Sequence, residues 1–156
     1  MKTNKIILLL LVVAFSACKP NNWLDWKSQN ELWLLENAKK EGVQTTHTGL
    51  QYKCIVPGLS ESSGHVDDAK YVTIKYSGKL INGFEFDASE AYDGQVNWFV
   101  PGFSEGLKLM KEFGVYEFYI PYDLGYGEAG TGTEGSGNHI PPYSTLIFRV
   151  ELLDVY

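Results

Sequence analysis

The sequence predicts an α+β domain in which an antiparallel sheet packs against a single helix. Three segments, 50–56, 71–80 and 145–155, alternate apolar and polar residues with the period of two that marks strands with one buried face. Only one segment between the strands has helical spacing, and its apolar residues fall at i, i+4 and i+7 as Phe103, Leu107 and Met110. Short strands interrupted by one helix are typical of this fold class.

A helical arm is expected ahead of the sheet, from Trp23 to about Lys40. Ser28 and Glu31 have the spacing of a capping box at a helix start, and Gly42 is placed to end the helix. The arm carries more apolar side chains than one narrow stripe requires. We therefore expect it to pack on its own domain, with a second copy of the chain or another partner as the alternatives.

The remaining elements follow a linker over 43–48. We expect the strands, in chain order, over 50–56, 71–80, 84–87, 115–120 and 145–155. Asn82-Gly83 predicts a two-residue type I′ hairpin turn, because both central positions of that turn need positive φ. Pro101-Gly102 is expected to open the helix, and the glycine-rich stretch 125–138 to form a long loop.

The first seventeen residues are expected to be a secretory signal peptide. Lys2 and Lys5 form a basic start, an apolar run follows over 6–15, and two small residues precede Cys18. The apolar run is about half the ~20 residues that a membrane-spanning helix requires. A cysteine directly after Phe-Ser-Ala resembles the lipobox of bacterial lipoproteins, so we expect Cys18 to carry lipid. The alternative is an ordinary signal peptide with an incidental cysteine.

Composition narrows the partners that the chain can have. Its 13 basic and 19 acidic residues give a net charge of −6, and removal of Lys2 and Lys5 with the signal makes it −8. An acidic chain without basic clusters is a poor partner for nucleic acid. With Cys18 acylated, Cys54 has no cysteine left to pair with, and we expect it to be a small apolar filler in its strand.

The motifs of three other site classes are present only in part. Gly102–Gly106 fits the Gly-x-Ser-x-Gly elbow around Ser104, and Asp123 and His139 follow in the order of a hydrolase triad. The chain is too short for the strand–helix alternation of that fold. The glycines of 125–135 match a dinucleotide fingerprint, but no helix-forming sequence follows them. The histidines lack cysteine or carboxylate partners at the spacing of metal ligands. From these three observations we expect no hydrolase site, no cofactor site and no metal site.

Five collinear motifs resemble those of FKBP-type peptidyl-prolyl isomerases. They are Val72–Gly78, Gly83–Ser89, Val100–Leu107, Leu124–Gly127 and Ile140–Phe148. The resemblance extends from about Gly49 to Val155 and implies a twisted antiparallel sheet of five to six strands wrapped around one short helix. The chain would then divide into a signal peptide over 1–17, a lipid-attachment tether and helical arm over 18–48, and an isomerase domain over 49–156.

The resemblance also implies an aromatic pocket for a proline ring. Its catalytic residues would be Tyr76, Phe86, Asp87, Tyr126 and Phe148, and its substrate-binding residues Phe99, Val100, Phe103, Ile140 and Trp98. Phe103 would form the floor, while the Tyr126 hydroxyl and the Val100 amide would donate hydrogen bonds to the substrate. Val96 competes with Trp98 for one pocket position. Turning a peptide bond breaks no covalent bond, so such a pocket needs no cofactor.

The implied partners are proline-containing polypeptides in the bacterial envelope, where lipid on Cys18 would hold the protein to a membrane on the periplasmic or surface side. Macrolide inhibitors are expected to bind weakly, because Phe103 replaces the tryptophan that is usual in the family. A homodimer formed through the arm is a further alternative. The alternative function is a weakly catalytic or inactive binding module that holds clients through the pocket, the long loop or the arm.

Overall fold

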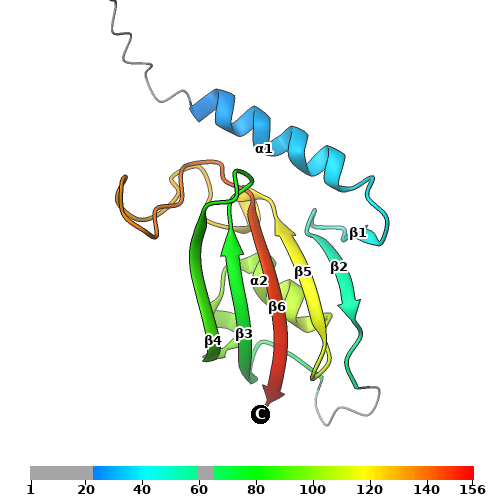
Figure 1. Cartoon of the computed structure of the whole chain (residues 1–156). Helices are drawn as coiled ribbons and strands as arrows, with labels where there is room; N and C mark the ends of the chain where they lie inside the picture. The colour runs from blue at the N-terminus through cyan, green and yellow to red at the C-terminus, as the bar shows by residue number, and fades with distance from the viewer. Residues whose placement is uncertain (1–22, 60–64) are drawn as a thin grey trace, which may run out of the picture.

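The computed structural model describes residues 23–59 and 65–156, in which six antiparallel strands form one sheet that curves around a short helix (Figure 1). In chain order the strands are β1 (Val43–Thr45), β2 (Gln51–Val56), β3 (Tyr71–Lys79), β4 (Glu85–Gln95), β5 (Val115–Ile120) and β6 (Leu146–Val155). The helices are α1 (Trp23–Asn37) and α2 (Pro101–Lys108), with 3₁₀ turns η1 (Val96–Trp98) and η2 (Tyr122–Leu124). The predicted α+β class is confirmed, since α2 lies across one face of the sheet and α1 along its end.

The strand order is β1-β2-β5-β6-β3-β4, and both edge strands differ from the sequence prediction. The segment predicted as a linker over 43–48 contains β1, whose three residues pair with 51–53 of β2. The strand predicted over 84–87 continues to Gln95, pairing with β3 over its length. Most side chains of β4 are exposed, because an edge strand has one hydrogen-bonding neighbour and little covering it. It therefore lacks the apolar alternation that reveals a strand in a sequence.

The turn between β3 and β4 is wider than the type I′ turn that Asn82-Gly83 predicts. Gly83 has a φ of 85°, but Asn82 does not have the positive φ that this turn type requires. The Gly83 N–H donates to the Leu80 carbonyl, and the Leu80 N–H donates to the Phe84 carbonyl. The Asn82 side chain accepts a hydrogen bond from the Phe84 N–H, which stabilises this alternative.

The core lies between the sheet and α2, as the alternation predicts. The inward side chains of β6 are buried, and these are Leu146, Phe148, Val150 and Leu152. Phe103 and Leu107 of α2 face them, and Met110 is buried just beyond the end of the helix. Cys54 of β2 is half-buried and packs against this core, in the filler position expected of it.

Two glycines let aromatic rings approach the backbone in this layer. A Cβ placed on Gly106 of α2 would stand 2.7 Å from the ring of Phe118, and one on Gly78 of β3 would stand 2.7 Å from the rings of both Phe148 and Phe86. These separations are shorter than a van der Waals contact between carbons. Glycine at 106 is therefore a condition for packing α2 this closely on the sheet, and glycine at 78 is a condition for packing the Phe86 and Phe148 rings over β3.

The predicted arm is helical, but it does not begin with the predicted capping box. Ser28 and Glu31 lie inside α1, whose first described turn starts at Trp23. The Glu31 carboxylate is instead 3.9 Å from the Lys27 ammonium, one turn earlier on the helix surface. A capping-box pattern inside a longer helix is a false start signal, because serine and glutamate are also compatible with a helix interior.

The arm packs on its own domain, as expected, and does so through polar as well as aromatic contacts. The buried Asn30 side chain accepts a hydrogen bond from the Thr145 N–H at 2.7 Å and donates to the Trp26 carbonyl at 2.8 Å. The Trp26 indole N–H donates to the Ser144 hydroxyl at 3.0 Å. At the other end of α1, Asn37 donates to the Gln51 side chain. The arm is thus held to the segment that leads into β6.

The predicted signal peptide and Cys18 lie outside the described residues, so the signal peptide, the lipid and the division into segments stay predictions. Within 23–59 and 65–156, no helix is both long and apolar enough to cross a membrane.

Substituting Asn30 with alanine should lower the free energy of unfolding by about 1–3 kcal/mol, because the buried Thr145 N–H loses its acceptor. Urea denaturation of the variant and the parent measures the difference. Leu32→Ala on the exposed side of α1 is the control and should cost less than about 0.5 kcal/mol. Equal effects of the two substitutions would contradict the polar docking of the arm.

Gly106→Ala should also destabilise the protein, by about 1–3 kcal/mol, because the new methyl group overpacks the Phe118 ring. Helix propensity alone predicts the opposite sign, since alanine is favoured over glycine by about 1 kcal/mol in a helix interior. Thermal and urea unfolding decide between the two. Gly137→Ala, where a Cβ meets nothing within 4 Å, is the matched control and should leave stability nearly unchanged.

Candidate active site

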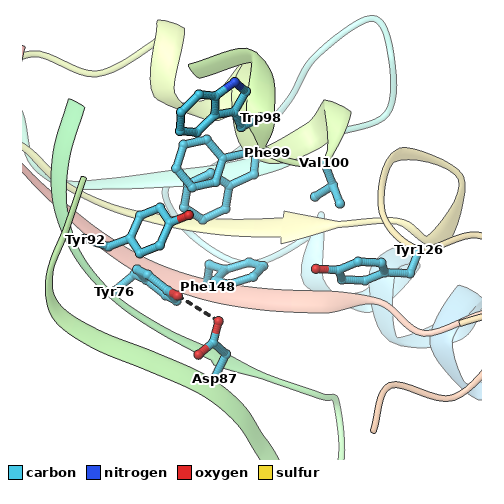
Figure 2. Close-up of a pocket in the computed structure, with 9 residues that line it drawn as sticks. Tyr76, Asp87, Tyr92, Trp98, Phe99, Val100, Tyr126 and Phe148 are labelled. Atoms are coloured by element: carbon cyan, nitrogen blue, oxygen red, sulfur yellow. Dashed lines mark hydrogen bonds between the residues drawn. The ribbon is translucent and has the colours of Figure 1, made fainter. Parts of the chain in front are cut away.

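One cavity of about 290 Å³ opens between the sheet and the segment that leads into α2 (Figure 2). The sheet contributes Tyr76, Asp87, Tyr92 and Phe148, the segment from η1 into α2 contributes Trp98, Phe99, Val100 and Phe103, and the loop after η2 contributes Tyr126. Seven of these nine side chains are aromatic. The cavity volume lies at the small end of the range that is typical of small-molecule sites.

Phe103 closes the bottom of the cavity, where the family resemblance places the floor. Its side chain is only 2% exposed. The Phe99 ring stacks on it with centroids 4.8 Å apart, and the Phe148 ring meets it edge-on, also at 4.8 Å. Pro101 holds the first turn of α2, so Phe103 enters the core at a fixed angle from the helix start.

The polar side-chain groups of the cavity are one carboxylate, three phenol hydroxyls and the indole N–H of Trp98. The Tyr76 hydroxyl donates to Asp87 Oδ2 at 2.7 Å, and Figure 2 shows the Tyr126 hydroxyl directed into the same space. Burial, reinforced by the hydrogen bond to Asp87, raises the pKa of Tyr76 far above its ordinary value. Burial and then the charge of Asp87 also raise the pKa of Tyr126. Both hydroxyls therefore keep their protons at neutral pH.

Phe86 and Ile140, two predicted site residues, do not line this cavity. They line a second, adjoining cavity that shares Asp87, Tyr126 and Phe148 with the first. Both side chains are almost fully buried, and the Phe86 ring meets the Phe148 ring edge-on at 5.5 Å. The structure thus brings all ten predicted pocket residues into two neighbouring cavities, with Phe148 and Asp87 at their boundary.

The competition between Val96 and Trp98 is decided by burial. Val96 is fully buried in the core, whereas Trp98 is 63% exposed and lines the cavity. The indole of Trp98 lies beside the Phe99 ring at the rim (Figure 2).

Tyr92 lines the cavity but was not predicted from the sequence. Its ring contacts Tyr76 and Phe99 edge-on, with centroids 6.1 and 5.8 Å apart. There are two reasons. The sequence predicts that the strand ends near Asp87, and a register shift between Ile74 and Tyr76 changes which residues of β4 face the cavity. Simple alternation from Asp87 would place odd-numbered residues there, so only knowledge of this bulge could have identified Tyr92.

Ser104, the serine of the hydrolase-like motif, is not a nucleophile in this structure. It is buried inside α2, and its hydroxyl donates to the Val96 carbonyl at 2.6 Å. This bond ties η1 to α2 and uses the only proton of the hydroxyl. In the described part of the chain there is also no cluster of three or more histidine, cysteine or carboxylate side chains that could hold a metal ion.

Comparison with known proteins places these features in one family. A family model described as FKBP-type peptidyl-prolyl cis-trans isomerase matches residues 63–153, and one described as the domain amino terminal to that isomerase matches residues 22–54. A probable FKBP-type peptidyl-prolyl cis-trans isomerase FkpA of Neisseria meningitidis is 41% identical over 133 residues, covering 83% of this chain and 46% of the relative. An outer membrane protein MIP of Legionella longbeachae is 35% identical, covering 83% of this chain and 54% of the relative.

A solved structure shows the same relationship. FkpA from Escherichia coli superposes with a TM-score of 0.76 at 38% identity, covering 85% of this chain and 60% of that one. The chain spans about half the length of the curated relatives it matches. The collinear motifs, the sheet around α2 and the aromatic cavity agree with these matches, and the chain belongs to the FKBP-type peptidyl-prolyl cis-trans isomerase family.

Proposed function

We propose that this protein is a peptidyl-prolyl cis-trans isomerase that accelerates rotation about X–Pro bonds in secreted or envelope polypeptides. The observation that carries the proposal is the cavity itself: seven aromatic rings surround a space of about 290 Å³ that contains hydroxyl donors and one carboxylate. Its one hydroxyl–carboxylate pair, Tyr76 and Asp87, is a poor nucleophile, because the raised pKa of Tyr76 keeps the phenol protonated. The cavity suits a reaction in which the substrate changes its geometry and no covalent bond is broken.

The barrier to this rotation is electronic, and the cavity can lower it by its environment. Resonance flattens the amide and gives a barrier of about 18–20 kcal/mol. The planar amide is more polar than the twisted one, so water stabilises it more. A cavity walled by Phe99, Phe103 and Phe148 removes that water, and any interaction made better with the twisted amide than with the planar forms speeds rotation.

Two hydrogen-bond donors can act on the substrate carbonyls. The Tyr126 hydroxyl faces the cavity and has no partner within the described part of the chain. The Val100 amide precedes α2 and likewise donates to no group among the described residues. Donors placed in advance at the positions of the twisted amide cost no reorganisation during the reaction. Asp87, fixed by the Tyr76 hydroxyl, would contact the substrate at the rim.

The proposal includes the setting of the protein as well as its reaction. Lipid on Cys18 would tether it to a membrane of the bacterial envelope, and the relative named an outer membrane protein is consistent with that location. The arm would be the contact surface of a homodimer, because α1 exposes three leucines, Leu24, Leu32 and Leu35. Macrolide inhibitors would bind weakly, because Phe103 offers a smaller floor than tryptophan.

A protease-coupled or NMR exchange assay on short X–Pro peptides tests the activity. The parent protein should accelerate rotation, and the double variant Tyr126→Phe/Asp87→Ala should lose about fivefold to 150-fold in kcat/KM, as expected for two hydrogen bonds of about 0.5–1.5 kcal/mol each. Tyr143→Phe, on a tyrosine outside the cavity, is the control and should keep full activity. A folded parent protein that gives no acceleration would contradict the isomerase and favour a binding module.

The raised pKa of Tyr126 predicts how activity depends on pH. An ordinary phenol has a pKa of about 10 and is half ionised at about pH 10, so it would lose half its donors there. Because burial raises the pKa of Tyr126, its hydroxyl should still be mostly protonated. We expect kcat/KM at about pH 10 to stay above half its value at about pH 7.5, with folding checked by circular dichroism. A steeper loss in the folded protein would contradict a protonated Tyr126 as donor.

A further inference from the structure

Three exposed aromatic side chains form a continuous row on the surface, from Trp98 through Tyr71 to Tyr156, which we name the aromatic strip. The Trp98 and Tyr71 rings meet edge-on with centroids 5.6 Å apart, and the Tyr71 and Tyr156 rings stack at 6.0 Å. Their exposed fractions are 63%, 38% and 55% in the same order. Mutual contact of three large exposed rings is a feature of recognition surfaces, in which tryptophan and tyrosine are enriched.

The strip is not needed to hold β3 and β6 together. The backbones of Tyr71 and Tyr156 exchange two hydrogen bonds, each N–H donating to the carbonyl of the other residue. The adjacent Val72 and Val155 are buried in the core and supply the apolar anchor at this end of the sheet. Neither tyrosine ring belongs to the buried core, so core packing does not explain why large rings occupy these two positions.

The strip begins at the wall of the cavity. Trp98 lines the cavity together with Phe99, and Figure 2 shows its indole at the rim above the Phe99 ring. The two ring separations place Tyr156 within about 12 Å of Trp98, which an extended polypeptide spans with about three to four residues. A chain whose proline lies in the cavity can therefore reach the far end of the strip with residues close to that proline.

This continuity decides what the strip can bind. A folded partner or a second copy seated permanently on Trp98 would cover part of the wall of the cavity and hinder entry of a substrate. The occupant must therefore be the molecule that enters the cavity. We propose that the aromatic strip binds the flank of an extended, proline-containing polypeptide, and favours a large apolar or aromatic side chain about three to four residues from the proline.

The proposal rests on the proposed isomerase function and extends it to the class of substrate. Large apolar side chains are exposed in unfolded chains and buried in folded ones. A site that needs both an accessible X–Pro bond and a nearby apolar residue would select unfolded segments over the exposed prolines of folded proteins. Phenol and indole rings suit this task, because they offer large contact areas at a low cost in conformational entropy.

The test compares peptides of two lengths on the full chain and on the variant Tyr71→Thr/Tyr156→Thr. Threonine keeps the strand preference of both positions while removing the rings. Peptides of about four residues occupy the cavity alone, and peptides of about ten residues carry phenylalanine before or after the proline at the distance given above. We expect the variant to turn over the short peptides like the parent and to lose about threefold to tenfold on one of the long peptides, mainly through a higher KM.

Control variants distinguish a failure of the strip proposal from a failure of the proposed isomerase activity. Leu32→Thr/Leu35→Thr removes two exposed apolar side chains from α1, away from the cavity, and should change neither peptide series. If the parent accelerates short peptides but the strip variant handles both long peptides like the parent, the strip proposal is wrong and the isomerase stands. If the parent accelerates neither series, calorimetric binding of the long peptides still decides, and equal affinity for parent and variant overturns the strip proposal.

A last outcome concerns contact between copies of the chain. If the parent self-associates, the variant does not, and the long-peptide kinetics are unchanged, the strip is a contact between copies and the proposal is overturned.

Discussion

Phe103 contacts four other rings, and three of them, Tyr76, Phe99 and Phe148, line the cavity that it closes. The fourth, Phe118, lies behind Phe103 in the core and is fully buried. This layer exists only because glycines at 78 and 106 allow the rings to contact the backbone directly. The site is therefore an opening in the core packing, and its walls inherit the rigidity of a close-packed interior.

The arm is connected to the same layer through polar atoms. Asn30 and Trp26 hold Thr145 and Ser144, and this short segment lies between Ile140, which lines the second cavity, and Phe148. An apolar interface could slide at little cost, whereas a buried amide with directional hydrogen bonds specifies one position. The arm thus has a defined place on the domain even though several of its leucines remain exposed.

The features predictable from sequence are those that leave a periodic or collinear pattern. Alternation located the buried strands β2, β3 and β6, and the ordered motifs located nearly every ring of the site. The edge strands β1 and β4 carry no such pattern. Backbone hydrogen bonds to one neighbouring strand hold each of them in place, and many of their side chains are exposed to solvent, so these side chains need not alternate between apolar and polar. Tyr92 depends on a bulge, and the burial of Asn30 depends on a contact 115 residues away, so neither has a local signal. Ser28 and Glu31 have a local pattern, but it is misleading, because both residues lie inside α1.

The electrostatics of the cavity restrict the chemistry that it can perform. Asp87 is its one carboxylate and accepts a hydrogen bond from the Tyr76 hydroxyl. Burial raises the pKa of Tyr76 and of Tyr126, so both hydroxyls stay protonated. Protonated phenols are weak nucleophiles at neutral pH, so a covalent intermediate on Tyr76 or Tyr126 is disfavoured. What the cavity can still do is bind one shape of an uncharged amide in preference to another. Peptide-bond rotation, the proposed reaction, requires only that preference, and the apolar walls of the cavity are the feature that can supply it.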